Sequence, residues 1–454
     1  MTLFVPIALY GWIPVVLLFF AVLPARRAVI VAFLASWLFL PVAGYSLPGL
    51  PDYTKMTATS YGVMLGVVLF DSGRVMRFRF SWIDLPMLVW CLSPFASSIS
   101  NGLGPYDGLS GVMSVTIKWG VPYLIGRLYF SDIEGLRELA IGVFVGGLIY
   151  VPFCLYEIRF SPQLHKLVYG FFPHRSFNAH RWGGYRPFVF MNEGLALGMW
   201  MTAASLVGFW LWWTKSLRTV GHMPTAMLFP ILLVTTIFCK ASGALLLLAA
   251  GIGVLLLTRW TRTKVFLMCL ILMPIGYLVV RSTGDRSGQA IVEMSKMMSN
   301  ERAGSLQFRL DHEDLLAAKA WERPVFGWGG WGRNRVYNDR DKDITITDGM
   351  WIIAFGQRGL VGLVALYGVF LLPSIVLVWR VPAMKWSLPA FASVGAFAVF
   401  LILFSIDQLL NAMPNPVFVV CAGGLGGFAA AMGRSMMRSV GLSAVQRSLR
   451  PHAG

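Results

Sequence analysis

The chain has 454 residues, of which 57% are hydrophobic, and its mean hydropathy is +0.67. Because soluble proteins contain roughly 45–50% apolar residues even when glycine is counted, this composition excludes an ordinary soluble protein and predicts a polytopic membrane protein. A formal net charge of +17 is compatible with nucleic-acid binding, but the basic residues are spread over short connections instead of one polar domain, so we expect no nucleic-acid partner.

Thirteen apolar segments are long enough, or nearly so, to cross a bilayer, which needs about 20 helical residues. They lie near residues 4–23, 28–45, 57–71, 82–99, 109–129, 138–158, 192–213, 224–240, 242–258, 265–282, 349–379, 387–405 and 413–433. The first has no preceding basic region and no small-residue cleavage site, so we expect a retained span and not a signal peptide. The sequence predicts an all-α polytopic protein with about 12–13 transmembrane helices; whether the short segment 57–71 spans is open.

Alternate connections between these segments carry basic clusters, which the positive-inside rule assigns to the cytoplasm. The clusters are Arg26/Arg27, Arg74/Arg77/Arg79, Arg127/Arg137, Lys215/Arg218, Arg259/Arg262/Lys264, Arg380/Lys385 and the C-terminal arginines. We therefore expect a membrane protein with its N-terminus outside and its C-terminus in the cytoplasm. The expected regions are N-terminal spans (1–158), a basic outer loop (159–191), central spans (192–282), a large outer loop (283–348), C-terminal spans (349–433) and a basic cytoplasmic tail (434–454).

The outer loop 159–191 carries five basic residues and no acidic residue, although a translocated loop has no topological reason to collect positive charge. The five are Arg159, Lys166, Arg175, Arg181 and Arg186. Arginine matches phosphate oxygens with a fork of donors, so we interpret the loop as a site for an anionic substrate. Contact with the phosphates of outer-leaflet lipids is the alternative. Asn192 and Glu193 follow, and we expect them to cap the next span.

Segments 224–240 and 242–258 are separated only by residues 240–243, so they predict a tight helical hairpin that opens outward. Lys240 lies at its tip. A lysine at that depth is costly unless it is paired or lines a wet cavity. The two interpretations are a functional site and snorkelling to the interface.

The stretch 305–362 is polar although the chain around it is apolar. Residues 306–321 favour a helix that ends before Pro324, with Arg309, His312 and Glu313 on one amphipathic face. A cluster of four glycines follows, and such a turn can direct backbone N–H groups at an anion. The glycines are Gly327, Gly329, Gly330 and Gly332, interleaved with Trp328, Trp331, Arg333 and Arg335.

Each candidate residue in this stretch has two interpretations. Asp348, where the chain turns back into apolar sequence, is either a general base or the N-cap of the next span, and the roles are compatible. Arg309 either binds an anionic group or pairs with Glu313 on a solvated helix. His312 is an alternative base or a polar surface residue. Arg358 either faces a cavity or snorkels outward.

The tryptophans Trp321, Trp328 and Trp331 either stack on sugar faces or lie at the membrane interface. Five cysteines are scattered singly in apolar sequence (Cys91, Cys154, Cys239, Cys269 and Cys421), so we expect buried small side chains and no metal site. The glycine-rich spelling at 327–332 follows no predicted strand, which argues against a dinucleotide site, and we expect no cofactor.

Three stretches resemble the bacterial O-antigen ligase and O-antigen polymerase superfamily. They are RPFVFMN at 186–192, the hairpin KASGALLL at 240–247, and a set comprising Arg309, AW at 320–321, PVFGWG at 324–329, DGMWII at 348–353 and GQRGLVG at 356–362. The resemblance covers roughly residues 180–370. The chain departs from the family's pattern at Asp348, where ligases have a histidine. It also departs at Ser242, where the family has a hairpin arginine. Lys240 restores the positive charge but lacks the forked guanidinium group of arginine.

The resemblance implies an all-helical C-type glycosyltransferase that takes a glycan from a polyprenyl diphosphate on the outer face and needs no metal. It implies that Arg309 binds the donor diphosphate, with Arg186, Lys240 and Arg358 as further ligands, and that Asp348 accepts the proton of the acceptor hydroxyl. His312, Arg181, Trp328 and Trp331 are secondary candidates. The implied partners are the lipid-linked oligosaccharide, an acceptor glycan, membrane lipids and a polysaccharide chain-length co-polymerase.

Three functions remain open from the sequence. A polymerase adds repeat units to a growing lipid-linked chain, whereas a ligase moves the finished glycan to lipid A core or protein; the missing histidine favours an exopolysaccharide polymerase. A flippase for the same lipid-linked glycan would need charges distributed through its spans. Here the polar residues are concentrated on one side, which favours the enzyme.

Overall fold

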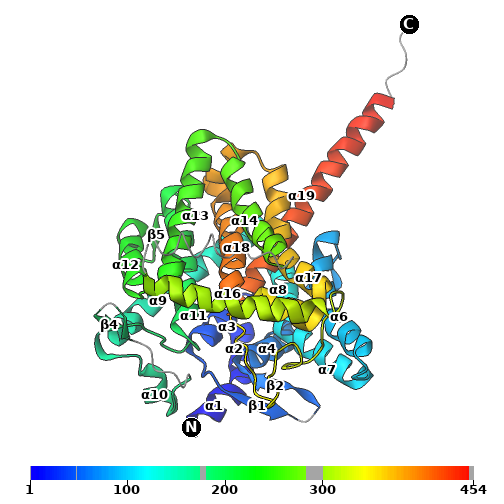
Figure 1. Cartoon of the computed structure of the whole chain (residues 1–454). Coiled ribbons are helices and arrows are strands. Elements are labelled where there is room, and N and C mark those ends of the chain that lie inside the picture. Colours follow the sequence, from blue (N-terminus) through cyan, green and yellow to red (C-terminus); the bar gives the residue numbers. More distant parts are fainter. Residues whose placement is uncertain (1, 48, 174–179, 182, 283–299, 449–454) are drawn as a thin grey trace.

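The computed structural model describes residues 2–47, 49–173, 180–181, 183–282 and 300–448, and its side chains are described only in part at 181, 300–306 and 434–448. It consists almost entirely of helices (Figure 1). Arg175, much of the large outer loop and the last residues of the predicted tail lie outside the described residues, as does the side chain of Arg181.

The first half of the chain contributes three two-stranded ribbons and helices that are mostly short, apart from two of 28 and 20 residues. Its helices are α1 (Phe4–Tyr10), α2 (Trp12–Val22), α3 (Ala25–Phe39), α4 (Lys55–Phe70), α5 (Ser72–Met76), η1 (Trp82–Asp84), α6 (Leu85–Ser100), α7 (Pro105–Val115), the π-helical η2 (Thr116–Gly120), α8 (Val121–Tyr129), α9 (Ile133–Phe160), α10 (Leu164–Tyr169) and α11 (Gly194–Trp213). The antiparallel ribbons are β1 (Gly44–Leu47) with β2 (Leu50–Thr54), β3 (His180–Arg181) with β4 (Gly184–Tyr185), and β5 (Thr219–Val220) with β6 (Met223–Pro224).

The second half contributes longer helices. They are α12 (Thr225–Phe238), α13 (Ser242–Thr261), α14 (Val265–Ser282), α16 (Asn300–Trp321), α17 (Met350–Arg380), η3 (Ala383–Ser387), η4 (Pro389–Phe391), α18 (Ala392–Leu410) and α19 (Pro416–Ser448). The predicted hairpin is confirmed, because only residues 239–241 separate α12 from α13. The predicted helix 306–321 is α16, which begins six residues earlier and ends, as expected, before Pro324.

All thirteen predicted apolar segments contain helix, but fewer of them qualify as spans. Within the described residues, eight helices are long and apolar enough to cross a membrane, and a ninth is added if the pair α1 and α2, bent by 42°, counts as one span. The prediction of 12–13 spans was too high because segment 109–129 is divided among α7, η2 and α8, and because α3, α4 and α12 have only 15, 16 and 14 residues. At 1.5 Å per residue these helices reach about 20–25 Å, less than the hydrocarbon core of about 30 Å.

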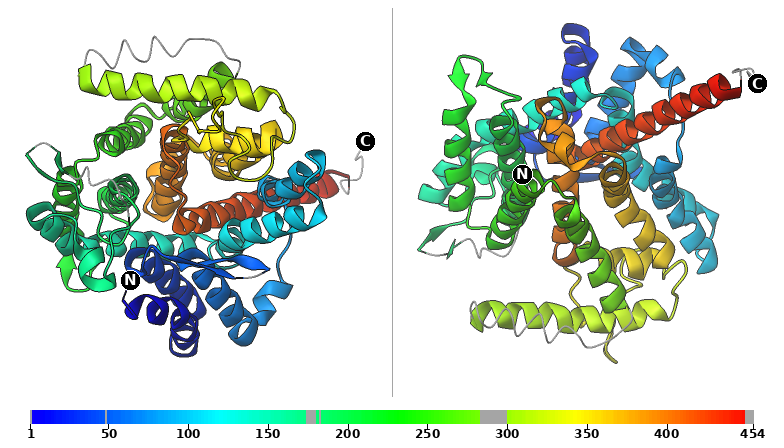
Figure 2. Two further views of the ribbon diagram at one scale, coloured as in Figure 1. Left: turned by 60° about the horizontal axis from the view of Figure 1, so that its bottom comes forward. Right: turned by 90° about the horizontal axis from the view of Figure 1, so that it is seen from above.

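The helices are arranged around a buried centre. Most of α11, α18 and α19 up to Gly433 is buried, whereas α13 and α14 are largely exposed on the outside. Figure 2 shows α18 and the first part of α19 between the N-terminal helices on one side and α16 on the other. Four of the five cysteines are buried, as predicted; Cys269 is exposed on α14, because that helix lies on the periphery.

Helix α16 lies across the bundle instead of along it (Figure 1). Its sequence is polar on average, so it does not qualify as a span. The N-terminus, α10 and the β1–β2 ribbon lie toward one end of the bundle, and the connection between α13 and α14 lies toward the other (Figure 1). The crossing helix therefore positions its polar face over the ends of α17 and α18.

Candidate functional site

Arg309 on α16 and Asp348 before α17 form an ion pair. The Arg309 Nε atom lies 3.1 Å from Asp348 Oδ2, and the two side chains are 29% and 37% exposed. Arg309 Nη1 also donates to the carbonyl oxygen of Leu410 at 3.3 Å. The two residues that the sequence singled out as phosphate ligand and base are thus in direct contact, and both remain accessible from outside.

Two alternatives from the sequence are wrong. The N-cap of α17 is Gly349, and no side chain caps this helix, so Asp348 is not its capping residue. The expected pair of Arg309 with Glu313 is replaced by the pair with Asp348, because Glu313 faces into the bundle and is 3% exposed. Glu193 does occupy the N-cap position of α11, although its side chain does not cap the helix.

Glu313 anchors α16 to the bundle. Its carboxylate accepts hydrogen bonds from the Tyr277 hydroxyl at 2.9 Å and from Trp351 Nε1 at 3.2 Å, and lies 3.4 Å from Arg281 Nη2. Arg281 also pairs with Asp314 at 2.8 Å. Burial raises the pKa of Glu313 above its usual value, although the bonds from Tyr277 and Trp351 and the charge of Arg281 oppose the shift. This buried network fixes the face that carries Arg309.

The glycine-rich turn after α16 pairs with a break in α17. Gly359 has φ +63° and ψ −164°, which interrupts the helix. The N–H groups of Trp328 and Gly329 donate to the carbonyls of Gly356 and Gln357 at 2.8 and 3.0 Å, and the Leu360 N–H donates to the Pro324 carbonyl at 2.7 Å. The break leaves helix carbonyls without intrahelical partners, and the turn supplies the donors.

This pairing corrects one expectation from the sequence. Two of the N–H groups that we expected to face an anion are used by the broken helix instead. A glycine is required at the contact, because a Cβ atom on Gly327 would lie 2.5 Å from the Arg358 backbone nitrogen. The glycines therefore allow two backbones to approach, which is a structural role.

The tryptophans of this turn differ in exposure. Trp328 lies between two cations, with Lys319 Nζ at 3.9 Å and Arg323 Cζ at 4.7 Å from its ring centroid, and its Nε1 donates to the Lys319 carbonyl at 2.8 Å. Trp331 is 66% exposed. Arg335 Cζ lies 4.9 Å from its ring centroid. Of the two, Trp331 is the more exposed ring and the better candidate for stacking on a sugar.

Downstream of the turn, Arg335 pairs with Asp343 and donates to the Thr347 hydroxyl at 3.2 Å. Burial acts to raise the pKa of Asp343. The hydrogen bonds from Arg335 and Thr345 outweigh this effect and lower the pKa below its usual value. This pair holds the segment that leads to Asp348.

Arg358 lines a polar cavity of about 400 Å³ between α6, α7 and the glycine-rich turn. Its Cζ lies 3.7 Å from the centroid of the Trp90 ring, and Nη1 donates to the Trp90 carbonyl at 3.3 Å. Other polar lining residues are Ser97, Ser98, Asp107, Ser110, Ser114 and Gln357, with Trp331 beside them. Of the two interpretations from the sequence, the structure favours the cavity.

Arg186 lies against the start of α11, and Lys240 lies against the ribbon that precedes this helix. Arg186 is 7% exposed and packs on Gly194, where a Cβ atom would lie 2.5 Å from its Nε. Lys240 is 9% exposed, and its Nζ lies beside Gly184 of β4, two residues before Arg186. The hairpin lysine therefore contacts the basic outer loop and does not snorkel.

A second cavity, of about 470 Å³ and with a mostly apolar lining, lies between α3, α4, η2, α11 and the connection after α18. Lys55, Lys118 and Asn192 line it, together with Met413 and Pro414. Lys55 Nζ donates to the carbonyls of Trp37 and Phe190 at 3.2 and 3.1 Å. The same connection begins after Leu410, whose carbonyl binds Arg309. The cavity therefore lies between the Arg186 segment and the Arg309 segment.

Neither Lys118 nor Lys55 was singled out as a site residue from the sequence. The signal at Lys118 was its position in an apolar segment; its π-helical backbone in η2 was not visible in the sequence. π-Helical turns occur frequently at functional sites. Lys55 was overlooked because it stands at the edge of its segment.

An apolar groove of about 820 Å³ runs between α6, α14 and α17. Its walls include Val89, Leu278, Val364 and Leu371. Val279 and Val364, which are 59% and 70% exposed, open it to the side of the bundle. The groove begins at Leu360 and Val361, directly after the break in α17.

His312 packs against Phe308, with ring centroids 4.3 Å apart, and points to no described acid or base partner. Within the described residues, no group of three or more His, Cys, Asp and Glu side chains is arranged to hold a metal ion. No protein-family model matches the chain, and no curated protein matches it.

Proposed function

We propose that this multi-pass membrane protein is a glycosyltransferase of the bacterial cytoplasmic membrane. It transfers a glycan from a polyprenyl diphosphate carrier to a hydroxyl of an acceptor sugar on the outer face, as a polymerase of an exopolysaccharide or O-antigen. The observation that carries the proposal is the accessible ion pair of Arg309 and Asp348 at the crossing helix. The sequence resemblance to O-antigen ligases and polymerases supports it.

The reaction needs a base and a cation at one point. The acceptor oxygen forms a bond to the anomeric carbon, the bond from that carbon to the diphosphate oxygen breaks, and the acceptor proton passes to Asp348. Negative charge builds on the leaving diphosphate, and a guanidinium such as Arg309 stabilises it; a preorganised donor of this kind contributes about 3 kcal/mol in other enzymes.

The ion pair itself suggests an order of events. In the structure, Asp348 Oδ2 is engaged by Arg309. A diphosphate carries more negative charge than a carboxylate and accepts the guanidinium fork equally well. Donor binding therefore draws Arg309 from Asp348 to the phosphate, which frees the carboxylate for the acceptor hydroxyl. The base becomes available only when the donor is bound.

Further cations lie around the cavity beside this pair. Lys55 and Lys118 line it, and Arg186 packs on Gly194, two residues after its Asn192 wall. We assign this cavity to the diphosphate. Arg358 lines the polar cavity together with Trp331, so we assign it to the sugars instead. The apolar groove between α6, α14 and α17 has the chemistry and lateral opening that a polyprenyl tail requires.

A deletion strain separates the candidate functions. Loss of polymer with accumulation of single lipid-linked repeat units supports the polymerase, whereas accumulation of long lipid-linked chains indicates a ligase. If the chain is a flippase, its deletion leaves the lipid-linked repeat units on the inner face. The purified chain in nanodiscs, given the lipid-linked repeat units from that strain, should extend them in the presence of a chelator. No extension with or without added divalent metal would refute the enzyme.

A further inference from the structure

The connection between α4 and α6 encloses an arginine-rich cavity with the turn between α8 and α9. Its volume is about 380 Å³. Four arginines line it, Arg74, Arg77, Arg79 and Arg127, and the acidic lining residue is Asp71. The sequence analysis used these residues only to orient the chain.

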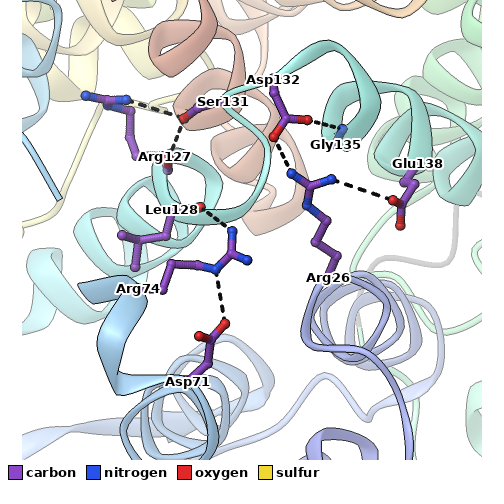
Figure 3. A network of polar contacts seen from close by, with 9 residues as sticks. All are labelled: Arg26, Asp71, Arg74, Arg127, Leu128, Ser131, Asp132, Gly135 and Glu138. Carbon is purple, nitrogen blue, oxygen red and sulfur yellow. Dashed lines mark hydrogen bonds and ion pairs between the residues drawn. The ribbon is translucent and has the colours of Figure 1, made fainter. Parts of the chain in front are cut away.

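Two of the arginines are held in place by carboxylates. Arg127 Nε and Nη2 lie 2.6 and 3.0 Å from the two oxygens of Asp84, which is 4% exposed. Arg74 Nε lies 3.0 Å from Asp71, and its Nη1 donates to the Leu128 carbonyl at 3.2 Å (Figure 3). The cavity therefore has a fixed polar wall.

The other two arginines leave an excess of positive charge. Among the described residues, neither Arg77 nor Arg79 has a carboxylate within ion-pair distance, and both are exposed. The neighbouring Arg26 differs, because Asp132 and Glu138 both contact its guanidinium (Figure 3). Four guanidinium groups face two carboxylates at the cavity, so two positive charges remain for a ligand.

The cavity lies at the end of the bundle away from Asp348. α17 begins beside Asp348 and ends at Arg380, whose Nη1 donates to the Ala429 carbonyl of α19. Arg127 lies against the same part of α19, since a Cβ atom on Gly427 would be 2.7 Å from its Nη1. The part of α17 after the break has about 20 residues and spans about 30 Å, one hydrocarbon thickness.

Apolar side chains project outward around the cavity. Phe70, Met76, Phe80 and Trp82 are 52%, 87%, 56% and 54% exposed. Exposed apolar groups beside arginines at the end of membrane helices are typical of the bilayer interface, where tryptophan is enriched. A ligand here can place phosphate among the arginines and hydrocarbon against these side chains at the same time.

We propose that this cavity binds the phosphate headgroup of an anionic phospholipid in the cytoplasmic leaflet. Arg77 and Arg79 supply the charge, while Arg74 and Arg127 are fixed by their carboxylates and shape the pocket. Basic pockets between transmembrane helices on the cytoplasmic side are suited to such headgroups. The site is separate from the proposed glycosyl transfer and does not depend on it.

The test compares lipid retention by the purified full chain. Native mass spectrometry in mild detergent, after incubation with phosphatidylglycerol or phosphatidylcholine, should show preferential retention of phosphatidylglycerol. The double variant Arg77→Gln/Arg79→Gln should bind it roughly 30-fold more weakly. The control Arg27→Gln/Arg262→Gln removes the same charge from exposed arginines at other basic connections and should bind like the unmodified chain.

Three results would overturn the proposal. Equal retention of the two lipids by the unmodified chain would show no headgroup site, and equal loss in the control variant would show a general charge effect. Inorganic phosphate that raises the melting temperature as much as phosphatidylglycerol does would identify free phosphate as the ligand. Because Arg77 and Arg79 are exposed, the variants should keep the melting temperature of the lipid-free chain, which verifies their folding.

Discussion

The guanidinium of Arg309 contacts the carboxylate of Asp348 across the gap between the crossing helix α16 and the start of α17. If this pair were only structural, exchanging the two charges would preserve its function. We expect the variant Arg309→Asp/Asp348→Arg to accumulate in the membrane at a normal level but to lose at least 100-fold in transfer rate, the order found when one transition-state donor is removed. Quantitative blotting and glycan analysis measure the two effects. Transfer within a few-fold of normal would assign the pair to stability.

Arg309→Ala should abolish polymer formation, and Arg309→Lys should recover little of it. Lysine keeps the charge but lacks the planar fork that binds two phosphate oxygens, so it should restore little activity. The measured quantity is the polymer yield at a matched protein level. Arg323→Lys, on the neighbouring turn, is the control and should retain normal yield. Full activity of Arg309→Lys would show that a point charge suffices there.

Asp348→Asn tests the base without changing the size of the side chain. Asp348 does not cap α17. The amide should therefore lower the free energy of unfolding by no more than about 1 kcal/mol, the usual contribution of an exposed ion pair. Transfer should fall by about 100- to 10,000-fold, the usual contribution of a general base. A purified variant that still extends lipid-linked repeat units at a normal rate would remove Asp348 from the reaction.

Gly359→Ala should destabilise the fold. The backbone conformation of Gly359 is accessible almost only to glycine and costs about 1–3 kcal/mol for other residues. A Cβ atom there would also collide with the backbone of Val325. Thermal unfolding of the purified chain should show a lower melting temperature. Gly276→Ala on α14, where a Cβ atom meets no neighbour within 4 Å, is the matched control and should not lower it.

Arg281→Gln should make stability depend on pH. It leaves the buried Glu313 carboxylate without its cation, which typically costs about 3–5 kcal/mol. Loss of the positive charge raises the pKa of Glu313 in the folded chain further above its value in the unfolded chain. The variant is therefore most stable at low pH, where Glu313 is protonated in both the folded and the unfolded chain. It loses stability as the pH rises through the pKa of the folded chain. The melting temperature of the variant should approach that of the unmodified chain as the pH falls from 8 to 5. A constant difference would exclude this linkage.

The helical segments could be predicted from the sequence because apolar runs and their basic flanks are local signals. The end of α16 before Pro324 and the hairpin at Lys240 are of this kind. The number of spans was less predictable. Apolar content identifies a buried helix, but it does not distinguish a helix that crosses the bilayer from a 14-residue helix such as α12.

The site was predictable only as a set of residue types. Arg309 and Asp348 were chosen as single residues, and their contact depends on how α16 crosses the bundle, which no local pattern encodes. Gly359 was part of a motif, yet its role arises from residues 324–329 pairing with it across a loop. The cavity at Lys55 was equally hidden, since it is assembled from five separate parts of the chain.

The groove between α6, α14 and α17 faces the side of the bundle, and its walls are hydrocarbon. A molecule that fills it arrives by two-dimensional diffusion within the lipid and never passes through water. The occupancy of the groove is then set by the mole fraction of that molecule among the surrounding lipids. Diluting the membrane with inert lipid should therefore slow the proposed glycosyl transfer, whereas diluting the suspension with buffer should not.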